Sequence, residues 1–267
     1  GKITPKSTYV DKGVEEIDHF KIRNSDHQTH GVQTMTEVLE KSLNLGTIYV
    51  ERLLGNESFR KAVELFGFGK KTHIELSPEA SGNTSSLAKK GSVFGATASY
   101  GQGISITPIQ LVSAFAALGN GGKLMRPYIV DEIMRPDGSR ERTKPIMVAE
   151  AISERTSRLI SGMLVSVVEN GHGKRAGVPG YWVAGKTGTA QVSRKNGPGY
   201  QENVHIGSFA GYAPASDPKF VMLVKIDHPR DVEWAESSAA PLFGEMASFL
   251  LTYLQIPPER TIKTVGK

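Results

Sequence analysis

The chain has 267 residues, with 32 lysines and arginines against 27 acidic residues, and it contains no cysteine. This length allows one large domain or two small ones, and a composition of 39% hydrophobic and 22% charged residues is typical of a globular protein. The absence of cysteine excludes disulfides, thiolate metal sites and a cysteine nucleophile. A net charge of +5, without a basic stripe interleaved with aromatic residues, gives no sign of nucleic-acid binding.

The sequence also lacks the marks of a membrane span and of a chain start. It contains no run of 18 apolar residues, the length that a membrane-spanning helix needs, and its longest apolar run, residues 220–224, has the length of a strand. The chain opens without a starting methionine or a signal peptide. These features favour a segment from within a longer protein over a complete soluble one.

The first part of the chain predicts two short helices behind an irregular start. Residues 1–33 are polar and turn-rich and show little periodicity. Thr34 and Glu37 match a capping box, which predicts a helix beginning just after Thr34. A second helical pattern covers residues 45–54 and stops at Gly55.

The middle of the chain predicts helices separated by a long irregular stretch. Asn56 can cap a third helix, and the Gly-, Ser- and Thr-rich residues 67–106 predict loops. Thr107 and Gln110 match another capping box, with proline at the first helical position. The clearest amphipathic helix covers residues 153–170, and the glycine that follows supplies its C-terminal stop.

The last third of the chain changes from helical to strand patterns. Residues 181–191, 205–212 and 219–227 predict strands separated by turn residues, and residues 241–255 predict a final helix. Helices, then three sequential strands joined by short turns, then a helix predict an α+β fold with an antiparallel sheet flanked by helices. No linker divides the chain, so we expect a single domain over residues 1–267.

The most informative string is G-K-T-G-T-A at residues 185–190. Lys186 and the hydroxyls of Thr187 and Thr189 follow one another along a predicted strand, and Gly188 leaves the edge of that strand open to a close ligand. Taken alone, the string fits equally well a turn with a surface lysine.

The same region also matches a phosphate-binding loop. Residues 180–187 fit the pattern G-x-x-x-x-G-K-[ST], and the strand at 220–227 resembles the acidic strand that holds magnesium in such proteins. A phosphate loop must open a helix whose amide groups hold the phosphates. The intervening residues here are strand formers, however, and glycines and a proline follow Thr187 closely. We therefore expect a strand and no nucleotide site.

A second string, S-L-N at residues 42–44, gains meaning from the first. Residues i and i+2 of a helix face opposite sides, so Ser42 and Asn44 can share a site only if the triplet is a turn between helices. The alternative is a simple helix N-cap. S-x-N upstream of K-T-G provides two of the three motifs of the serine acyl-transferases that react with penicillin.

Much of the chain then resembles the transpeptidase domain of class B penicillin-binding proteins. The similarity is carried by G-Q-G-x-x-x-T-P-x-Q at 101–110, A-x-x-x-x-G-N-G-G-K at 114–123, V-A-G-K-T-G-T-A-Q at 183–191 and F-A-G-Y-A-P at 209–214. These motifs follow the order of the family over roughly residues 1–255. The resemblance implies the penicillin-binding transpeptidase architecture, which is similar to that of serine β-lactamases.

One motif of this family is missing from the sequence. No serine or threonine upstream of Ser42 has a lysine three positions later, so the S-x-x-K motif with the nucleophilic serine is expected before residue 1. Ser86 and Lys89 match S-x-x-K literally, but they lie in a predicted loop between the other motifs, and we interpret them as a chance match. His172 stands where the family commonly has the threonine of G-T-G, and we interpret it as a loop residue rather than a catalytic base.

The resemblance implies a reaction and a role for each motif residue. The family transfers the acyl group of a D-Ala-D-Ala stem peptide through an acyl-serine to the amine of a neighbouring stem, and β-lactams trap the acyl stage. Lys186 is expected to supply electrostatic stabilisation and to relay protons with Ser42. Asn44 is expected to bind the substrate backbone. The hydroxyls of Thr187 and Thr189 are expected to bind the terminal carboxylate, with the Thr189 N–H as half of an oxyanion hole.

The resemblance implies no metal or cofactor, and its partners are peptidoglycan stem peptides, β-lactams and, through the longer protein, other cell-wall synthesis proteins. It implies a location at the extracytoplasmic face of the bacterial cytoplasmic membrane, with no membrane contact from this segment and no nucleic acid. Two alternatives stay open: a catalytically silent remnant that uses the same fold for binding, and a hydrolytic relative, either a D,D-carboxypeptidase or a β-lactamase.

Overall fold

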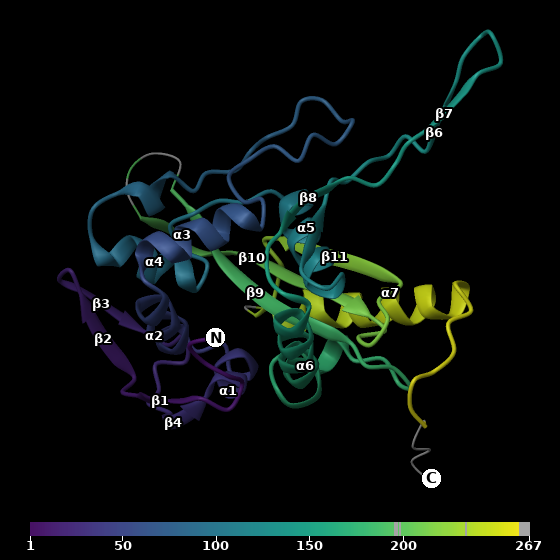
Figure 1. Cartoon of the computed structure of the whole chain (residues 1–267). Coiled ribbons are helices and arrows are strands. Elements are labelled where there is room, and N and C mark those ends of the chain that lie inside the picture. Colours follow the sequence, from purple (N-terminus) through teal and green to yellow (C-terminus); the bar gives the residue numbers. More distant parts are fainter. Residues whose placement is uncertain (195–196, 198, 233, 262–267) are drawn as a thin grey trace.

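A three-stranded antiparallel sheet lies at the centre of the molecule, with the strand order β11-β10-β9 (Figure 1). The computed structural model of the chain describes residues 1–194, 197, 199–232 and 234–261. The strands of the central sheet are β9 (Ala184–Ser193), β10 (Tyr200–Ala213) and β11 (Phe220–Asp227). They correspond to the three sequential strands that the sequence predicts, and β9 forms one edge of the sheet.

Helices cover both faces of this sheet. They are α5 (Pro108–Gly119), α6 (Glu154–Asn170) and α7 (Ala239–Tyr253). Alternate residues of a strand point to opposite faces: Phe209 of β10 contacts Phe243 of α7, with ring centroids 4.6 Å apart, whereas Tyr212 forms a hydrogen bond with Ser161 of α6. This arrangement confirms the predicted α+β class.

Two glycines allow the aromatic core to close on the sheet. Gly185 of β9 pairs with Gly211 of β10, and the ring of Phe209 lies across both. A Cβ atom at Gly185 would lie 2.4 Å from a ring carbon of Phe209, and one at Gly211 would lie 3.1 Å away. Because carbon atoms in contact need about 3.5–4.0 Å, the ring leaves no room for a side chain at Gly185. The strand that carries the K-T-G string is therefore packed directly on the core.

A largely helical region lies beside the sheet and includes the N-terminal strands (Figure 1). Its helices are α1 (Met35–Glu40), α2 (Asn44–Leu54), α3 (Asn56–Leu65) and α4 (Ser92–Ser99). Its strands pair as β1 (Thr8–Asp11) with β4 (Gly31–Thr34), and as β2 (Val14–Ile17) with β3 (Phe20–Arg23). Contacts of α1 with α6 join this region to the helices that cover the sheet.

Two further strand pairs follow α5. They are β5 (Lys123–Met125) with β8 (Met147–Glu150), and β6 (Glu132–Met134) with β7 (Arg140–Arg142). The β6–β7 hairpin projects from the body of the molecule as an arm (Figure 1). Short 3₁₀ turns complete the fold: η1 (Ser85–Ala88), η2 (Lys174–Ala176) and η3 (Ala235–Ser237). Within the described ranges, no helix is both long and apolar enough to cross a membrane.

Both predicted capping boxes are present. The Thr34 hydroxyl accepts from the Glu37 N–H while the Glu37 carboxylate accepts from the Thr34 N–H, and Thr107 and Gln110 repeat this exchange at α5. The predicted helix at 153–170 is also confirmed. Local hydrogen bonding decides these helix starts, so the sequence was sufficient to find them.

Other local expectations were wrong. Residues 1–33 form four strands, because each strand pairs with a partner that short-range periodicity does not reveal. The stretch 67–106 contains α4, a helix of small residues whose buried glycine and alanines pack against α2. The N-cap of α3 is Gly55, one residue before Asn56. The first two errors have a nonlocal contact as their cause.

Candidate active site

The K-T-G string lies on the edge strand of the central sheet. β9 pairs with β10, so that Lys186 stands opposite Ala210 and Thr189 opposite Gly207. The backbone from Ala184 to Ser193 is extended, and no helix begins at Lys186. This geometry rules out the phosphate-loop alternative, which needs the N-terminus of a helix at this position.

Ser42 lies in the turn between α1 and α2, as the S-x-N pattern predicts. Its backbone is in the left-handed region, with φ 55°, and the following Leu43 is fully buried and donates its N–H to the Val38 carbonyl at 2.9 Å. The turn therefore ends α1 and directs Ser42 away from the helix axis. Leu43, without a side-chain cap, is the N-cap of α2, so neither Ser42 nor Asn44 is a simple helix cap.

The structure brings Lys186 and Ser42 into direct contact across 144 positions of sequence. The Lys186 ammonium donates to the Ser42 hydroxyl at 2.9 Å, to the Thr187 carbonyl at 3.0 Å and to the Thr187 hydroxyl at 3.3 Å. The expected contact between the two motifs is therefore present. It joins the helical region to the edge strand of the sheet.

The side chain of Lys186 is half-buried, and its ammonium has no carboxylate partner among the residues that the structure describes. Desolvation by burial lowers the pKa of Lys186 to about 8. With this pKa, about one amine in ten is neutral at pH 7. A group with a pKa near neutral pH can both accept and return a proton, which suits a proton relay.

Thr187 and Thr189 lie on the face of β9 opposite to the face of Lys186. Because side chains alternate along a strand, Thr187 and Thr189 point to the α7 side, as does Phe209 opposite Thr187, whereas Lys186 points to the α6 side. The Thr189 hydroxyl accepts a hydrogen bond from the Ala235 N–H of η3 at 3.2 Å. This contact fixes the Thr189 side chain, and no pattern in the sequence predicts that η3 supports it.

Asn44 is the first residue of α2 and is held by β3. Its amide donates to the Arg23 carbonyl at 2.9 Å, so no contact brings it to Lys186. Next to it, buried Asn24 accepts from the Leu45 N–H at 3.2 Å and donates to buried Asp11 at 2.8 Å. These bonds anchor the start of α2, and with it the turn that carries Ser42.

The loop after α6 provides a support that sequence reasoning missed. The His172 N–H donates to the Glu40 carbonyl at 3.1 Å, and the His172 ring is hydrogen-bonded to Glu236 of η3 at 2.6 Å. A Cβ atom at Gly171 would lie 2.4 Å from the Glu40 carbonyl oxygen, so this glycine is required by the close approach of two backbones. Its φ of −104° shows that a left-handed stop, the usual reason for glycine here, does not apply.

Ser86 and Lys89 do not form a catalytic pair. The Ser86 hydroxyl donates to the Gly103 carbonyl at 2.8 Å, and the Lys89 ammonium lies 5.5 Å from the centroid of the Phe94 ring. The two side chains therefore have separate partners, consistent with a chance match to S-x-x-K. Among the described residues, no group of three or more His, Asp or Glu side chains is arranged to hold a metal ion.

A lysine on a K-T-G edge strand that is hydrogen-bonded to the serine of an S-x-N turn defines the class of serine acyl-transferases that react with penicillin. The chain belongs to the family of penicillin-binding protein transpeptidase domains, and the match to this family covers residues 1–248. The resemblance drawn from the motifs is thus confirmed.

Individual relatives agree with this assignment. Stage V sporulation protein D of Bacillus subtilis is 41% identical over 258 residues, which are 96% of this chain and 40% of that protein. Peptidoglycan D,D-transpeptidase FtsI of Escherichia coli is 33% identical over 229 residues, or 85% of this chain and 37% of that protein. The chain spans less than half the length of these relatives.

Solved structures give the same result for the fold. Penicillin binding protein 3 of Mycobacterium tuberculosis complexed with ampicillin superposes with a TM-score of 0.88 at 29% identity, covering 99% of this chain and 60% of that one. The complex of that protein with aztreonam has the same TM-score and identity.

Proposed function

We propose that this chain is part of a peptidoglycan D,D-transpeptidase and contains its proton-relay and carboxylate-binding residues. The observation that carries the proposal is the 2.9 Å hydrogen bond from Lys186 to Ser42, which joins the S-x-N and K-T-G motifs at one place. The names of the relatives support the reaction type, and the complexes of a related protein with two β-lactams support antibiotic binding.

In this proposal, the attacking serine belongs to an S-x-x-K segment that lies outside the sequence. Its oxygen forms a bond to the penultimate D-Ala carbonyl carbon, the C–N bond to the terminal D-Ala breaks, and the leaving amine takes up a proton. The amine of a neighbouring stem then attacks the acyl-serine, and the serine oxygen leaves and regains a proton. Both steps need a group that moves protons at the leaving atom.

Lys186 and Ser42 are suited to move that proton. The lowered pKa of Lys186 allows the amine to exchange a proton near neutral pH, and the Ser42 hydroxyl, as both donor and acceptor, extends the path by one atom. Thr187 and Thr189 bind the terminal carboxylate, Gly188 admits the substrate backbone to the edge of β9, and the Thr189 N–H donates to the oxyanion. Asn44 donates to the substrate with the amide hydrogen that Arg23 does not use.

The wider setting of the chain is part of the same proposal. We place it within a single transpeptidase domain at the extracytoplasmic face of the cytoplasmic membrane, where stem peptides are available and other cell-wall synthesis proteins are the partners. The match to the transpeptidase domain over residues 1–248 supports the single domain.

The test uses a protein in which this chain follows an S-x-x-K segment. Such a protein is incubated with a pentapeptide stem and an amine acceptor, and the products are separated by mass. A cross-linked dimer is the expected product, whereas release of D-Ala without cross-linking indicates a carboxypeptidase. Absence of both products, together with absence of a penicillin adduct, indicates the silent remnant and overturns the proposal. Lys186→Ala should abolish the dimer, and Lys89→Ala should leave it unchanged.

A further inference from the structure

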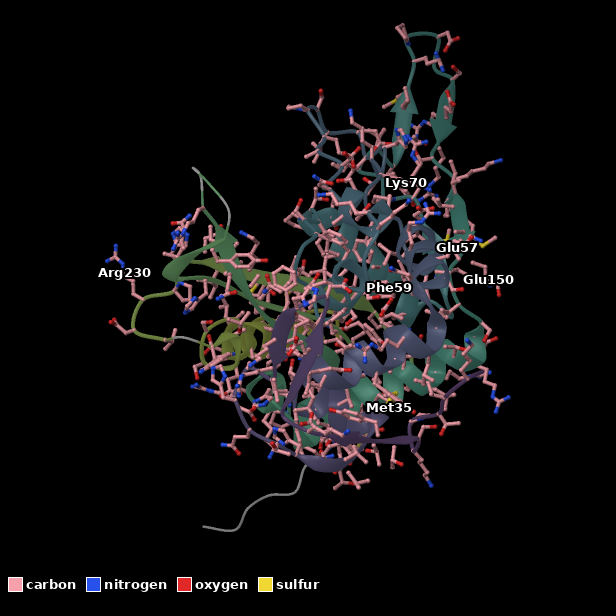
Figure 2. The ribbon with its side chains drawn as sticks, turned by 90° about the vertical axis from the view of Figure 1, so that its left-hand side faces the viewer. Met35, Glu57, Phe59, Lys70, Glu150 and Arg230 are labelled. Carbon is pink, nitrogen blue, oxygen red and sulfur yellow. The ribbon has the colours of Figure 1, made fainter. Side chains whose placement is uncertain are left out.

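A pocket with a volume of about 560 Å³ lies between α5, the end of α3 and the β5–β8 pair. We call it the α5 pocket, and its lining residues lie within 64–67, 70–73, 110–113, 124–127 and 148–149. None of the proposed active-site residues lines it. Figure 2 shows Lys70 of this pocket far across the molecule from Arg230, which follows the sheet strand β11.

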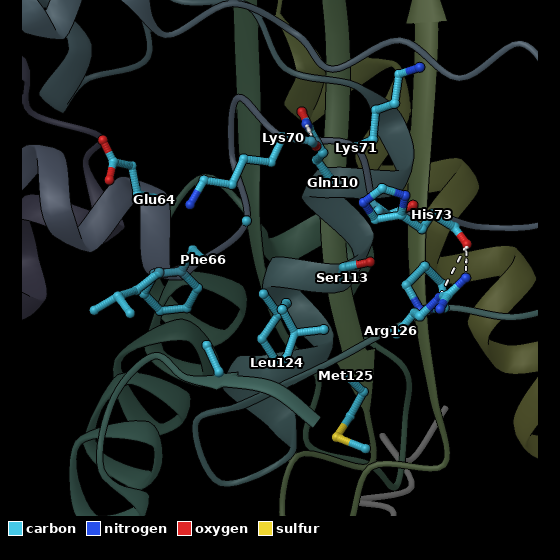
Figure 3. A pocket seen from close by; sticks show the side chains of 16 residues that line it. Glu64, Phe66, Lys70, Lys71, His73, Gln110, Ser113, Leu124, Met125 and Arg126 are labelled. Carbon is cyan, nitrogen blue, oxygen red and sulfur yellow. Dashed lines mark hydrogen bonds between the residues drawn. The ribbon is translucent and has the colours of Figure 1, made fainter. Parts of the chain in front are cut away.

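The wall of the α5 pocket is fixed in place by the protein itself. Gln110 is fully buried and donates to the carbonyls of Lys70 and Ser81 at 2.6 and 2.8 Å. At the other end of the wall, the Arg126 guanidinium donates twice to the His73 carbonyl, at 3.2 and 2.8 Å (Figure 3). Because hydrogen bonds already hold the wall of the pocket at both ends, the wall loses little conformational entropy when a ligand binds, which favours binding.

The floor and mouth of the α5 pocket are apolar. Phe66 and Leu124 lie side by side in the lining (Figure 3), and Met125 also lines the pocket. At its mouth Leu65 and Val148 are 45% and 60% exposed. Exposed apolar side chains that continue from a pocket onto the surface indicate an interaction site. A pocket of this volume has room for a few apolar side chains of a partner.

The rim of the α5 pocket has an excess of positive charge. Lys70, Lys71 and Arg126 line it against one carboxylate, Glu64, which is already paired with Arg60 at 3.1 Å. Within the described residues, neither lysine forms an ion pair, and both are exposed. Three of the five N–H groups of Arg126 also stay available after its bonds to His73.

Two further carboxylates near the rim offset part of this excess, but both accept from neutral donors and pair with neither lysine. Glu75 accepts from the Ile129 N–H at 2.9 Å, and Arg126 contributes to the lowered pKa of its carboxyl, whose largest cause is that hydrogen bond. The carboxylate of Glu79 is occupied by Thr72 and by the His73 N–H. The two lysines are therefore the free charges that a ligand meets.

We propose that the α5 pocket is a docking site for an acidic, amphipathic segment of a partner protein. Apolar side chains of the segment enter the pocket over Leu124 and Phe66, and its carboxylates meet Lys70, Lys71 and Arg126. The exposed apolar mouth favours a polypeptide over a small anion, because a small anion would leave Leu65 and Val148 in contact with water. Charge complementarity sets the direction and specificity of binding, and apolar burial supplies its strength.

The test follows binding at the methyl group of Met125 by NMR with labelled methionine. The first probe is a short synthetic peptide in which leucine and phenylalanine alternate with aspartate and glutamate. The second probe replaces each acidic residue by lysine, and the third is decanoate. We expect a saturable shift of the Met125 signal with the acidic peptide, at least about tenfold weaker binding of the lysine peptide, and no shift of Met35, which is buried in α1.

Two matched variants locate the site. Lys70→Glu with Lys71→Glu should weaken binding of the acidic peptide by about tenfold or more, whereas the same change at Lys89 and Lys90, another exposed lysine pair, should leave it unchanged. Equal binding of the two peptides overturns the proposed charge complementarity. Saturable decanoate binding without peptide binding overturns the peptide as occupant. No saturable shift with any probe overturns the site, and none of these outcomes depends on the transpeptidase reaction.

Discussion

Replacing Gly185 by alanine tests whether the core of the sheet fixes the strand that carries Lys186. The added Cβ would lie 2.4 and 2.5 Å from two ring carbons of Phe209 and 3.0 Å from the Ala210 carbonyl oxygen. Relief requires the ring to move by about 1 Å, because carbon atoms in contact need about 3.5–4.0 Å. The backbone at Gly185 is not in the left-handed region, so the cost is one of packing alone.

The ring of Phe209 has little room to move. It is fully buried, packs on Phe243 on one side and lies against Gly211 on the other. Forcing an extra carbon into such a core costs about 1–3 kcal/mol, and we expect the upper half of that range because the neighbouring ring is also fully buried. For a chain of this size, each kcal/mol lowers the melting temperature by about 2–4 °C. Gly185→Ala should therefore lower it by about 4–12 °C.

A glycine three positions along the same strand provides the control. A Cβ atom at Gly188 would meet only the Ser208 hydroxyl, at 2.8 Å, and that hydroxyl can rotate away. Gly188→Ala should therefore change the free energy of unfolding by about 0.5 kcal/mol or less. Both variants are measured by thermal unfolding under the same conditions.

A second substitution tests the cause of the effect. Phe209→Leu removes the ring that the alanine side chain would meet, so the loss caused by Gly185→Ala should be smaller in that background, with a coupling energy of about 1 kcal/mol or more. Equal melting temperatures for Gly185→Ala and Gly188→Ala, or additive effects of Gly185→Ala and Phe209→Leu, would refute the packing argument.

Three further expectations concern charge, chemistry and buried hydrogen bonding. Lys186→Met should stabilise the fold by about 1 kcal/mol at pH 7, because below pH 8 the folded state retains the full cost of the half-buried ammonium. Between pH 8 and 10.5 the folded state loses that proton before the unfolded state does, so the unchanged chain gains stability and its difference in free energy of unfolding from Lys186→Met disappears. An equal difference in denaturant titrations at pH 7 and 10 contradicts this. The chain alone should gain no mass from benzylpenicillin, and a stoichiometric adduct on Ser42 or Ser86 in intact mass spectra contradicts the assigned roles. Gln110→Ala should lower the free energy of unfolding by about 2 kcal/mol, since it leaves the half-buried carbonyls of Lys70 and Ser81 without their donor. Hydrogen exchange of residues 70–73 should rise, and unchanged exchange would contradict the role of Gln110.

The sequence was sufficient wherever short-range physics decides the structure. The capping boxes at Thr34 and Thr107 predict the starts of α1 and α5, because the donor and acceptor of each box lie within one helical turn. The strand at K-T-G also follows from local preference, since its upstream neighbours are strand formers and glycines follow it. These local signals favour a strand over the phosphate loop.

The order of the motifs supplied the family, and with it the expected partnership of Lys186 and Ser42. No local pattern of the sequence gives that distance, because it depends on how α1 and α6 pack and on how β9 sits at the edge of the sheet. For the same reason, the sequence could not show that Asn44 donates to the Arg23 carbonyl or that η3 supports Thr189.

The sequence by itself determined the family, the strand at K-T-G and the helix starts, because each depends on short stretches of residues that are neighbours along the chain. Tertiary structure alone decided the pKa of Lys186, the need for glycine at Gly185 and Gly171, and the positive rim of the α5 pocket. Each of these depends on which groups from distant parts of the chain exclude water or occupy space around a residue. Desolvation and close packing are properties of the assembled surroundings, so they exist only once the chain has folded.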